Sequence, residues 1–246
     1  MLNGSMSLAV VIHGPNGAHE AREYVSPIDH GTYIEGREGS NFTLRLRNGS
    51  PNRVLAVPSV DGLSVIDGKP AGSASPGYVL EPYQALDLVG WKVDGDTAAK
   101  FFFAGDGPKG DESYVAKIGG DVDNKGVIGA IFFAEDKPKP APSFPPRVFG
   151  HAKTMRSAPM MSSNACASAP EPDKRSLGAG FGESTDFRTT TVSVKRGGRL
   201  AEIVLNYDDA RGLKKMGIDL SRPATPRPSA FPADNQGCAP PADWKR

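Results

Sequence analysis

Four acidic residues are the first candidates for acid–base chemistry in this sequence. Each lies within or beside a glycine-containing turn signal: Glu35, Glu38, Asp61 and Asp67. Two carboxyl groups that flank one bond can divide the roles of general acid and general base in hydrolysis. Their glycine neighbours explain the same acids as ordinary turn residues. A hydrolase with such an acid pair is therefore kept as a hypothesis, and no residue is assigned as catalytic.

Three aromatic residues are candidates for ligand binding. They are Tyr78, Tyr83 and Trp91, which lie in or beside short β-prone segments. Large aromatic rings present flat apolar faces on which a ligand such as a sugar can stack. The same side chains serve equally well to fill a core. They define a second hypothesis, a carbohydrate-binding or adhesion module.

Metal and cofactor chemistry finds little support in the residue spacing. The four histidines form no His-x-x-x-His pair, which a zinc site would favour. Residues 121–126 resemble the start of a calcium loop, but Lys125 and Phe132 occupy positions where oxygen ligands are required. The glycine-rich stretches lack the Gly-Lys-Ser/Thr ending of a phosphate-binding loop. We expect no metal and no cofactor.

The composition excludes several classes of protein. Among 246 residues there are 29 Gly and 22 Pro, about a fifth of the chain, which argues against a helical bundle or a coiled coil. No stretch of the sequence is apolar over the length of a membrane span. The apolar run at residues 8–12 is too short for a signal peptide, so we expect synthesis in the cytoplasm without one. Two cysteines, Cys166 and Cys238, cannot form a disulfide framework.

The charge is distributed unevenly along the chain. Residues 1–135 carry 11 Lys/Arg and 17 Asp/Glu, a net charge of −6, whereas residues 136–246 carry 18 and 11, a net charge of +7. The basic residues are dispersed and are not interleaved with aromatic residues, so nucleic-acid binding is not expected. Opposite charges on the two parts favour contact between copies of the chain instead.

The first 135 residues have the pattern of short β-strands. Residues 41–47 alternate, with Phe42, Leu44 and Leu46 on one face, as in an antiparallel sheet with one wet side. Asp61-Gly62 between two apolar runs predicts a hairpin. Residues 98–104 contain three consecutive phenylalanines, and residues 127–134 are apolar throughout and predict a central strand. We therefore expect a mainly β fold, an antiparallel β-sandwich of jelly-roll or immunoglobulin-like type, over residues 1–135.

The remaining residues divide into three parts. Residues 136–180 hold eight prolines and are interpreted as a linker or as an extended arm that contacts neighbouring subunits. Residues 181–220 predict a hairpin, with strands at 189–195 and 200–207, followed by a short helix at 210–216. Residues 221–246 read as an irregular Pro-rich tail. The arm residues singled out for contact are Pro138, Pro140, Phe144, Phe149, Met155, Met160 and Met161.

Several strings of the sequence also resemble a known family. The strings are residues 33–39, 53–69, 77–83, 90–91, 113–117 and 126–133, with looser similarity at 177–183 and 203–217. Together they resemble a family of uncharacterised β-rich proteins encoded in bacterial genomes and in phage. That family has no established activity, so the resemblance implies a fold and no catalytic residues. The phage members imply a virion component.

These observations favour a non-enzymatic function. The leading hypothesis is a structural or interaction protein of a multi-copy assembly, best placed in a phage virion as a capsid decoration or a head or tail accessory protein. Its partners would be protein subunits of that assembly, which the arm contacts. A carbohydrate-binding or adhesion module and a hydrolase are the alternatives.

Overall fold

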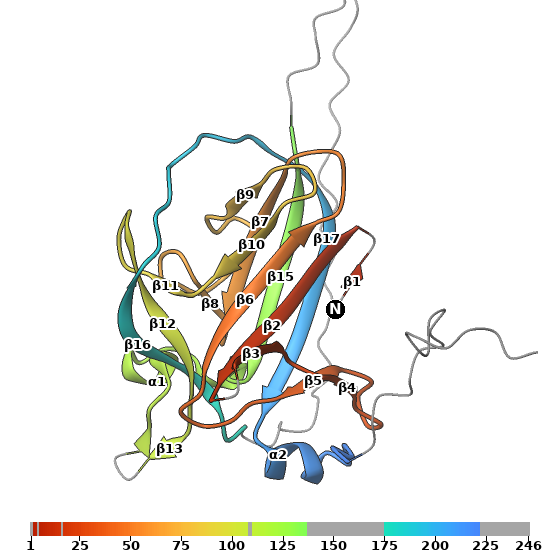
Figure 1. The fold of residues 1–246 in the computed structure, drawn as a ribbon, viewed down its shortest axis with the longest axis vertical. Coiled ribbons are helices and arrows are strands. Elements are labelled where there is room, and N and C mark those ends of the chain that lie inside the picture. The colour runs from red at the N-terminus through yellow and green to blue at the C-terminus, as the bar shows by residue number, and fades with distance from the viewer. Residues whose placement is uncertain (1, 4, 16, 108–109, 137–174, 222–246) are drawn as a thin grey trace, which may run out of the picture.

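The computed structural model describes residues 2–3, 5–15, 17–107, 110–136 and 175–221, which form two β-sheets (Figure 1). The predicted mainly β fold is confirmed, and the strands in the two sheets are antiparallel except for one parallel pair. The two sheets share one hydrophobic core and so form a sandwich-like arrangement.

The first sheet, called sheet A, has the path β1-β2-β6-β12-β11, with β3 beside β2, β10 beside β6 and β16 beside β12. Its strands are β1 (Leu2–Asn3), β2 (Met6–Gly14), β3 (Gly17–Glu20), β6 (Asn41–Asn48), β10 (Ala85–Leu88), β11 (Gly90–Lys92), β12 (Thr97–Ala104) and β16 (Gly178–Asp186).

The second sheet, called sheet B, has the path β4-β5-β17-β15-β7-β8, with β9 beside β7. Its strands are β4 (Glu23–Val25), β5 (Thr32–Glu35), β7 (Val54–Val60), β8 (Leu63–Ser64), β9 (Tyr78–Leu80), β15 (Val127–Glu135) and β17 (Arg196–Asp208). A small separate ribbon and three short helical segments complete the described chain. They are β13 (Asp106–Gly107), β14 (Gly110–Asp111), α1 (Tyr114–Lys117), a 3-10 turn (Val122–Asn124) and α2 (Ala210–Lys215).

Three local predictions are confirmed by the strand pairing. The alternating residues of β6 place Phe42, Leu44 and Leu46 in the core, each at most 1% exposed. The Asp61-Gly62 turn joins β7 to β8, and both residues have the positive φ that such a turn requires. The apolar strand β15 lies between β17 and β7 and is central, as expected.

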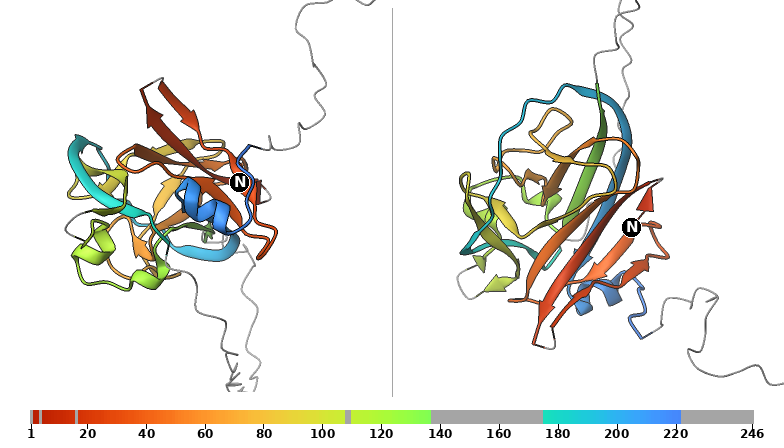
Figure 2. Two further views of the ribbon diagram at one scale, coloured as in Figure 1. Left: turned by 90° about the horizontal axis from the view of Figure 1, so that it is seen from below. Right: turned by 45° about the horizontal axis from the view of Figure 1, so that its top comes forward.

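The segment after residue 180 differs from the predicted hairpin. Residues 187–195 form no strand, and β17 runs unbroken from Arg196 through the expected turn at residues 196–199. β16 pairs with β12 in sheet A, whereas β17 pairs with β15 and β5 in sheet B. The connecting loop, residues 187–195, is called the strap; it arches from β16 to β17 (Figure 2, right). The predicted short helix is confirmed as α2, with Asp209 as its N-cap.

The C-terminal strands complete the same core as the N-terminal ones. Leu177, Ala179, Ile203 and Leu205 are buried in one cluster with side chains of β2, β6, β7, β12 and β15. Most of the predicted arm, residues 137–174, and most of the tail, residues 222–246, lie outside the described residues. The arm residues proposed for contact, from Pro138 to Met161, are among them.

Candidate functional site

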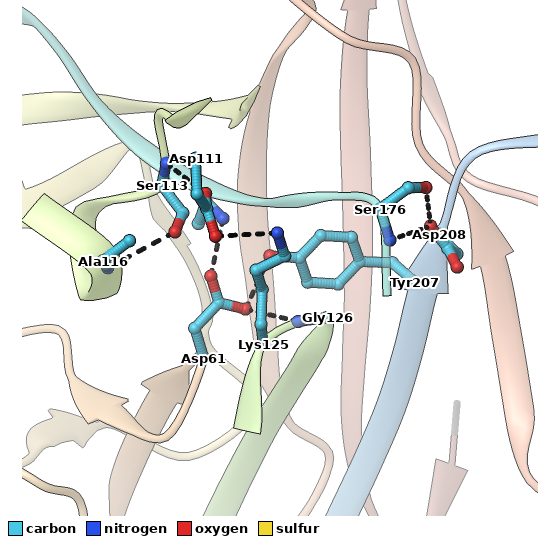
Figure 3. A network of polar contacts seen from close by, with 10 residues as sticks. Asp61, Asp111, Ser113, Ala116, Lys125, Gly126, Ser176, Tyr207 and Asp208 are labelled. Carbon is cyan, nitrogen blue, oxygen red and sulfur yellow. Dashed lines mark hydrogen bonds and ion pairs between the residues drawn. The ribbon is translucent and has the colours of Figure 1, made fainter. Parts of the chain in front are cut away.

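A buried carboxylate joins both sheets at one end of the core. Asp61 lies in the β7–β8 turn with φ 50° and is 1% exposed. Its carboxylate accepts hydrogen bonds from the backbone amides of Gly126 at 2.8 Å and Ala179 at 2.6 Å, and from the Tyr207 hydroxyl at 2.6 Å (Figure 3). These partners belong to the start of β15, to β16 and to β17. Asp61 therefore ties four chain segments together.

The environment of Asp61 sets its acid–base properties. Burial raises the pKa of Asp61 to about 6, although the hydrogen bonds from Ala179, Tyr207 and Gly126 act in the opposite direction. Burial, together with the nearby Asp61 carboxylate, also raises the pKa of Tyr207 well above its usual value. Tyr207 therefore stays protonated near neutral pH and donates its hydroxyl proton to Asp61. With three donors bound and almost no exposed surface, this carboxylate serves as a structural anchor.

The raised pKa of Asp61 predicts a specific dependence of stability on pH. In the folded state the pKa of about 6 lies above the usual 3.8, so folding favours the protonated carboxyl. This contribution is complete below about pH 4 and is lost as the pH rises through 6. We expect the difference in unfolding free energy between the wild type and Asp61→Asn to fall over that interval. Urea titrations at steps of pH 4 to 8 measure it, and a difference that does not change with pH would contradict the assignment.

Two further polar clusters flank this anchor. Lys125, only 8% exposed, forms an ion pair with Asp111 at 2.8 Å, and Ser113 caps α1 (Figure 3). Burial alone would raise the pKa of Asp111, but hydrogen bonds from Lys125 and Ser113 hold that pKa below its usual value. Asp208 accepts hydrogen bonds from the backbone and hydroxyl of Ser176. The network holds residues 175–179 against the ends of β15 and β17.

The four acids proposed from sequence lie in different environments. Asp61 is buried, Glu35 is half-buried on β5, and Glu38 and Asp67 are exposed. The hydrogen-bond partners of Asp61 are two amides and a phenol rather than a second carboxylate. Sequence reasoning did not find Tyr207 as the partner. Its alternation with Ala201, Ile203 and Leu205 was the available signal, because a buried tyrosine hydroxyl usually finds a partner.

The three candidate aromatic residues do not share one surface. Trp91 is 2% exposed, and its indole N–H donates to the Gly180 carbonyl at 3.0 Å. Tyr78 is 9% exposed and packs edge-on against Phe187 of the strap. Tyr83 is 70% exposed and stands on a backbone with φ 60°. Trp91 and Tyr78 therefore contribute to the core, and Tyr83 alone of the three faces solvent.

The structure contains a large groove along one edge of the sandwich, which we call the edge groove. It has a volume of about 650 Å³ and lies between the strap and strands β7, β9, β10 and β11. Its apolar lining includes Leu55, Leu86 and Phe187, and its charged lining includes Arg53 and Lys92. The buried Tyr78 hydroxyl, which has no hydrogen-bond partner among the residues that the structure describes, belongs to the same lining. The lining of the groove therefore combines apolar and polar side chains.

Within the described part of the chain, no three His, Cys, Asp or Glu side chains gather as a metal site would require. No helix in that part is long and apolar enough to span a membrane.

Comparison with known proteins gives no relative. The chain matches no protein-family model, no curated protein and no solved structure.

Proposed function

We propose that this protein is a non-enzymatic structural or interaction protein of a multi-copy assembly. The edge groove carries the proposal, because its lining combines apolar and charged side chains, as protein contact surfaces do. The charged side chains at the other end of the core also support the proposal, because they are buried and paired within the chain. Asp61, Lys125 and Asp208 all bind partners within the chain and are at most 8% exposed.

The partners in this proposal are other subunits of the same assembly. The charge of −6 on residues 1–135 and of +7 on residues 136–246 favours contact between the basic part of one copy and the acidic part of another. Residues 136–180 are the segment proposed to make that contact. We further propose a phage virion as the setting, on the strength of the sequence resemblance described above. Genes for capsid, portal or tail proteins beside the gene for this chain would support that setting.

The assembly is tested by mass and by one pair of matched variants. Light scattering after size exclusion should give the full chain a mass that is a multiple of 26.0 kDa. Val192 lines the edge groove and is 52% exposed, whereas Val25, which is 68% exposed, lies on β4. Val192→Asp should weaken association about tenfold, equivalent to ~1.4 kcal/mol, because it places a charge in an apolar contact.

Val25→Asp is the control and should associate like the wild type. A chain that stays monomeric at every concentration contradicts the assembly. Equal association of the two variants contradicts the assignment of the contact to the edge groove.

A further inference from the structure

We propose that residues 137–174 lie across the outer face of sheet B of their own chain. The proposal begins with the two ends of this segment. The chain leaves the described structure after β15, where the Asp136 amide donates to the Lys195 carbonyl at 2.9 Å. It returns at Arg175, whose guanidinium donates to the carbonyl of Gly126, the residue just before β15. The two ends therefore lie at opposite ends of one strand, separated by about 27 Å for nine residues.

Arg175 also shows on which face of the sheet the segment ends. Its guanidinium lies 5.4 Å from the centre of the Tyr33 ring and donates to the Asn206 side chain at 2.9 Å. Asn206 stands between Leu205 and Tyr207, both of which point into the shared core. Since successive side chains of a strand point to opposite faces, Asn206 points outward. The segment therefore ends on the outer face of sheet B.

The surface between these two ends is hollowed and has an aliphatic strip with polar side chains beside it. Val57, Gly129, Ile131 and Val204 line a groove of about 220 Å³ on this face, with Glu202 at its side. Val204, which pairs with Gly129 of β15, is 40% exposed. Gly129 deepens the groove, because a Cβ at this position would approach the Ser59 hydroxyl to 2.9 Å. A row of outward aliphatic side chains on a paired sheet is a surface that another segment can cover.

Residues 137–174 have the length and composition to cover that surface. About nine extended residues span the strand, and 38 are available. The segment contains Phe144, Phe149 and three methionines, which adapt well to irregular apolar grooves. Its two ends are fixed at the two ends of β15, and the Arg175 end lies on this face, so its local concentration there is far higher than that of a second copy. These features favour the chain's own segment as the occupant.

The inference concerns the isolated chain and does not depend on the proposed assembly. A segment docked on sheet B still presents its outward side to a neighbouring subunit. Association in light scattering and docking of this segment are therefore separate results, and either can fail without the other.

The test places a spin label in the middle of the segment. Ser157→Cys, with Cys166→Ser and Cys238→Ser, gives one labelling site in the full chain. The NMR signals of the Val204 and Ile131 methyl groups report on the outer face of sheet B, because a nearby spin label broadens such signals. Val11, which pairs with the outward Thr43 on sheet A, is the reference on the opposite face. We expect loss of the Val204 and Ile131 signals, with the Val11 signal retained.

A mixed sample identifies which chain supplies the segment. It combines spin-labelled chains without isotopes and isotope-labelled chains without the spin label. We expect no signal loss in this mixture, because the label then sits on another molecule. Loss of the Val204 signal in the mixture would show that a second copy supplies the segment and would overturn the proposal. Retention of the Val204 and Ile131 signals in the first sample would overturn it as well.

Discussion

Replacing Asp61 with alanine should lower the free energy of unfolding by about 3–5 kcal/mol, the largest effect expected for any polar residue of the described chain. The change leaves the Gly126 amide, the Ala179 amide and the Tyr207 hydroxyl buried without their acceptor. Each unsatisfied buried donor costs about 1–3 kcal/mol. Alanine also tolerates the backbone φ of 50° less well than aspartate does. Urea unfolding monitored by circular dichroism measures the change.

Asp67→Ala is the matched control for this prediction. Asp67 also precedes a glycine in a turn, but its side chain is exposed. Its removal should change the unfolding free energy by no more than about 0.5 kcal/mol. If Asp61→Ala were as stable as Asp67→Ala, the buried carboxylate would not be the anchor of the four segments.

Replacing Trp91 with alanine should cost about 3–5 kcal/mol of unfolding free energy. Its ring packs against Phe101 and Tyr114, at centroid distances of 5.2 and 4.9 Å, and the variant leaves a cavity between them. The Gly180 carbonyl also loses the indole N–H. Thermal and urea unfolding measure the loss, and Trp91→Phe, which keeps most of the volume, should fall between alanine and the wild type.

Tyr83→Ala is the control for the aromatic candidates. It removes a ring that is 70% exposed and keeps a non-glycine residue at the same positive φ, so it should change stability by less than about 1 kcal/mol. A Trp91→Ala variant with the stability of the wild type would show that the indole is not a core side chain.

Features with a local signature were predictable from the sequence. The alternation of residues 41–47, the Asp61-Gly62 turn and the capped helix after Asp209 all depend on neighbours a few positions apart. The partners of β16 and β17 were not predictable in this way. β12 and β16 pair across more than 70 residues, and no local pattern specifies which strand lies beside which.

The wrongly predicted hairpin has a physical explanation. Gly197 and Gly198 were interpreted as a turn, but they lie inside β17 opposite an irregular stretch of β15. A Cβ at Gly197 would approach the Ala134 carbonyl to 2.9 Å, so glycine permits the close approach of the two backbones there. Prediction of the site from the sequence was limited in a similar way. Sequence identified Asp61 but could not show that its carboxylate faces inward, toward Tyr207.

The position of β17 has a consequence for how the protein is made. In sheet B, β5 pairs with β4 on one side and with β17 on the other, and β17 alone links them to β15 among the described strands. β5 leaves the ribosome some 160 residues before β17 does. Until then the growing chain contains β4, β5 and β15 but lacks β17, the strand that lies between β5 and β15. The sheet can therefore close only near the end of synthesis, and a chain that stops before residue 196 would expose the edges of β5 and β15 to aggregation.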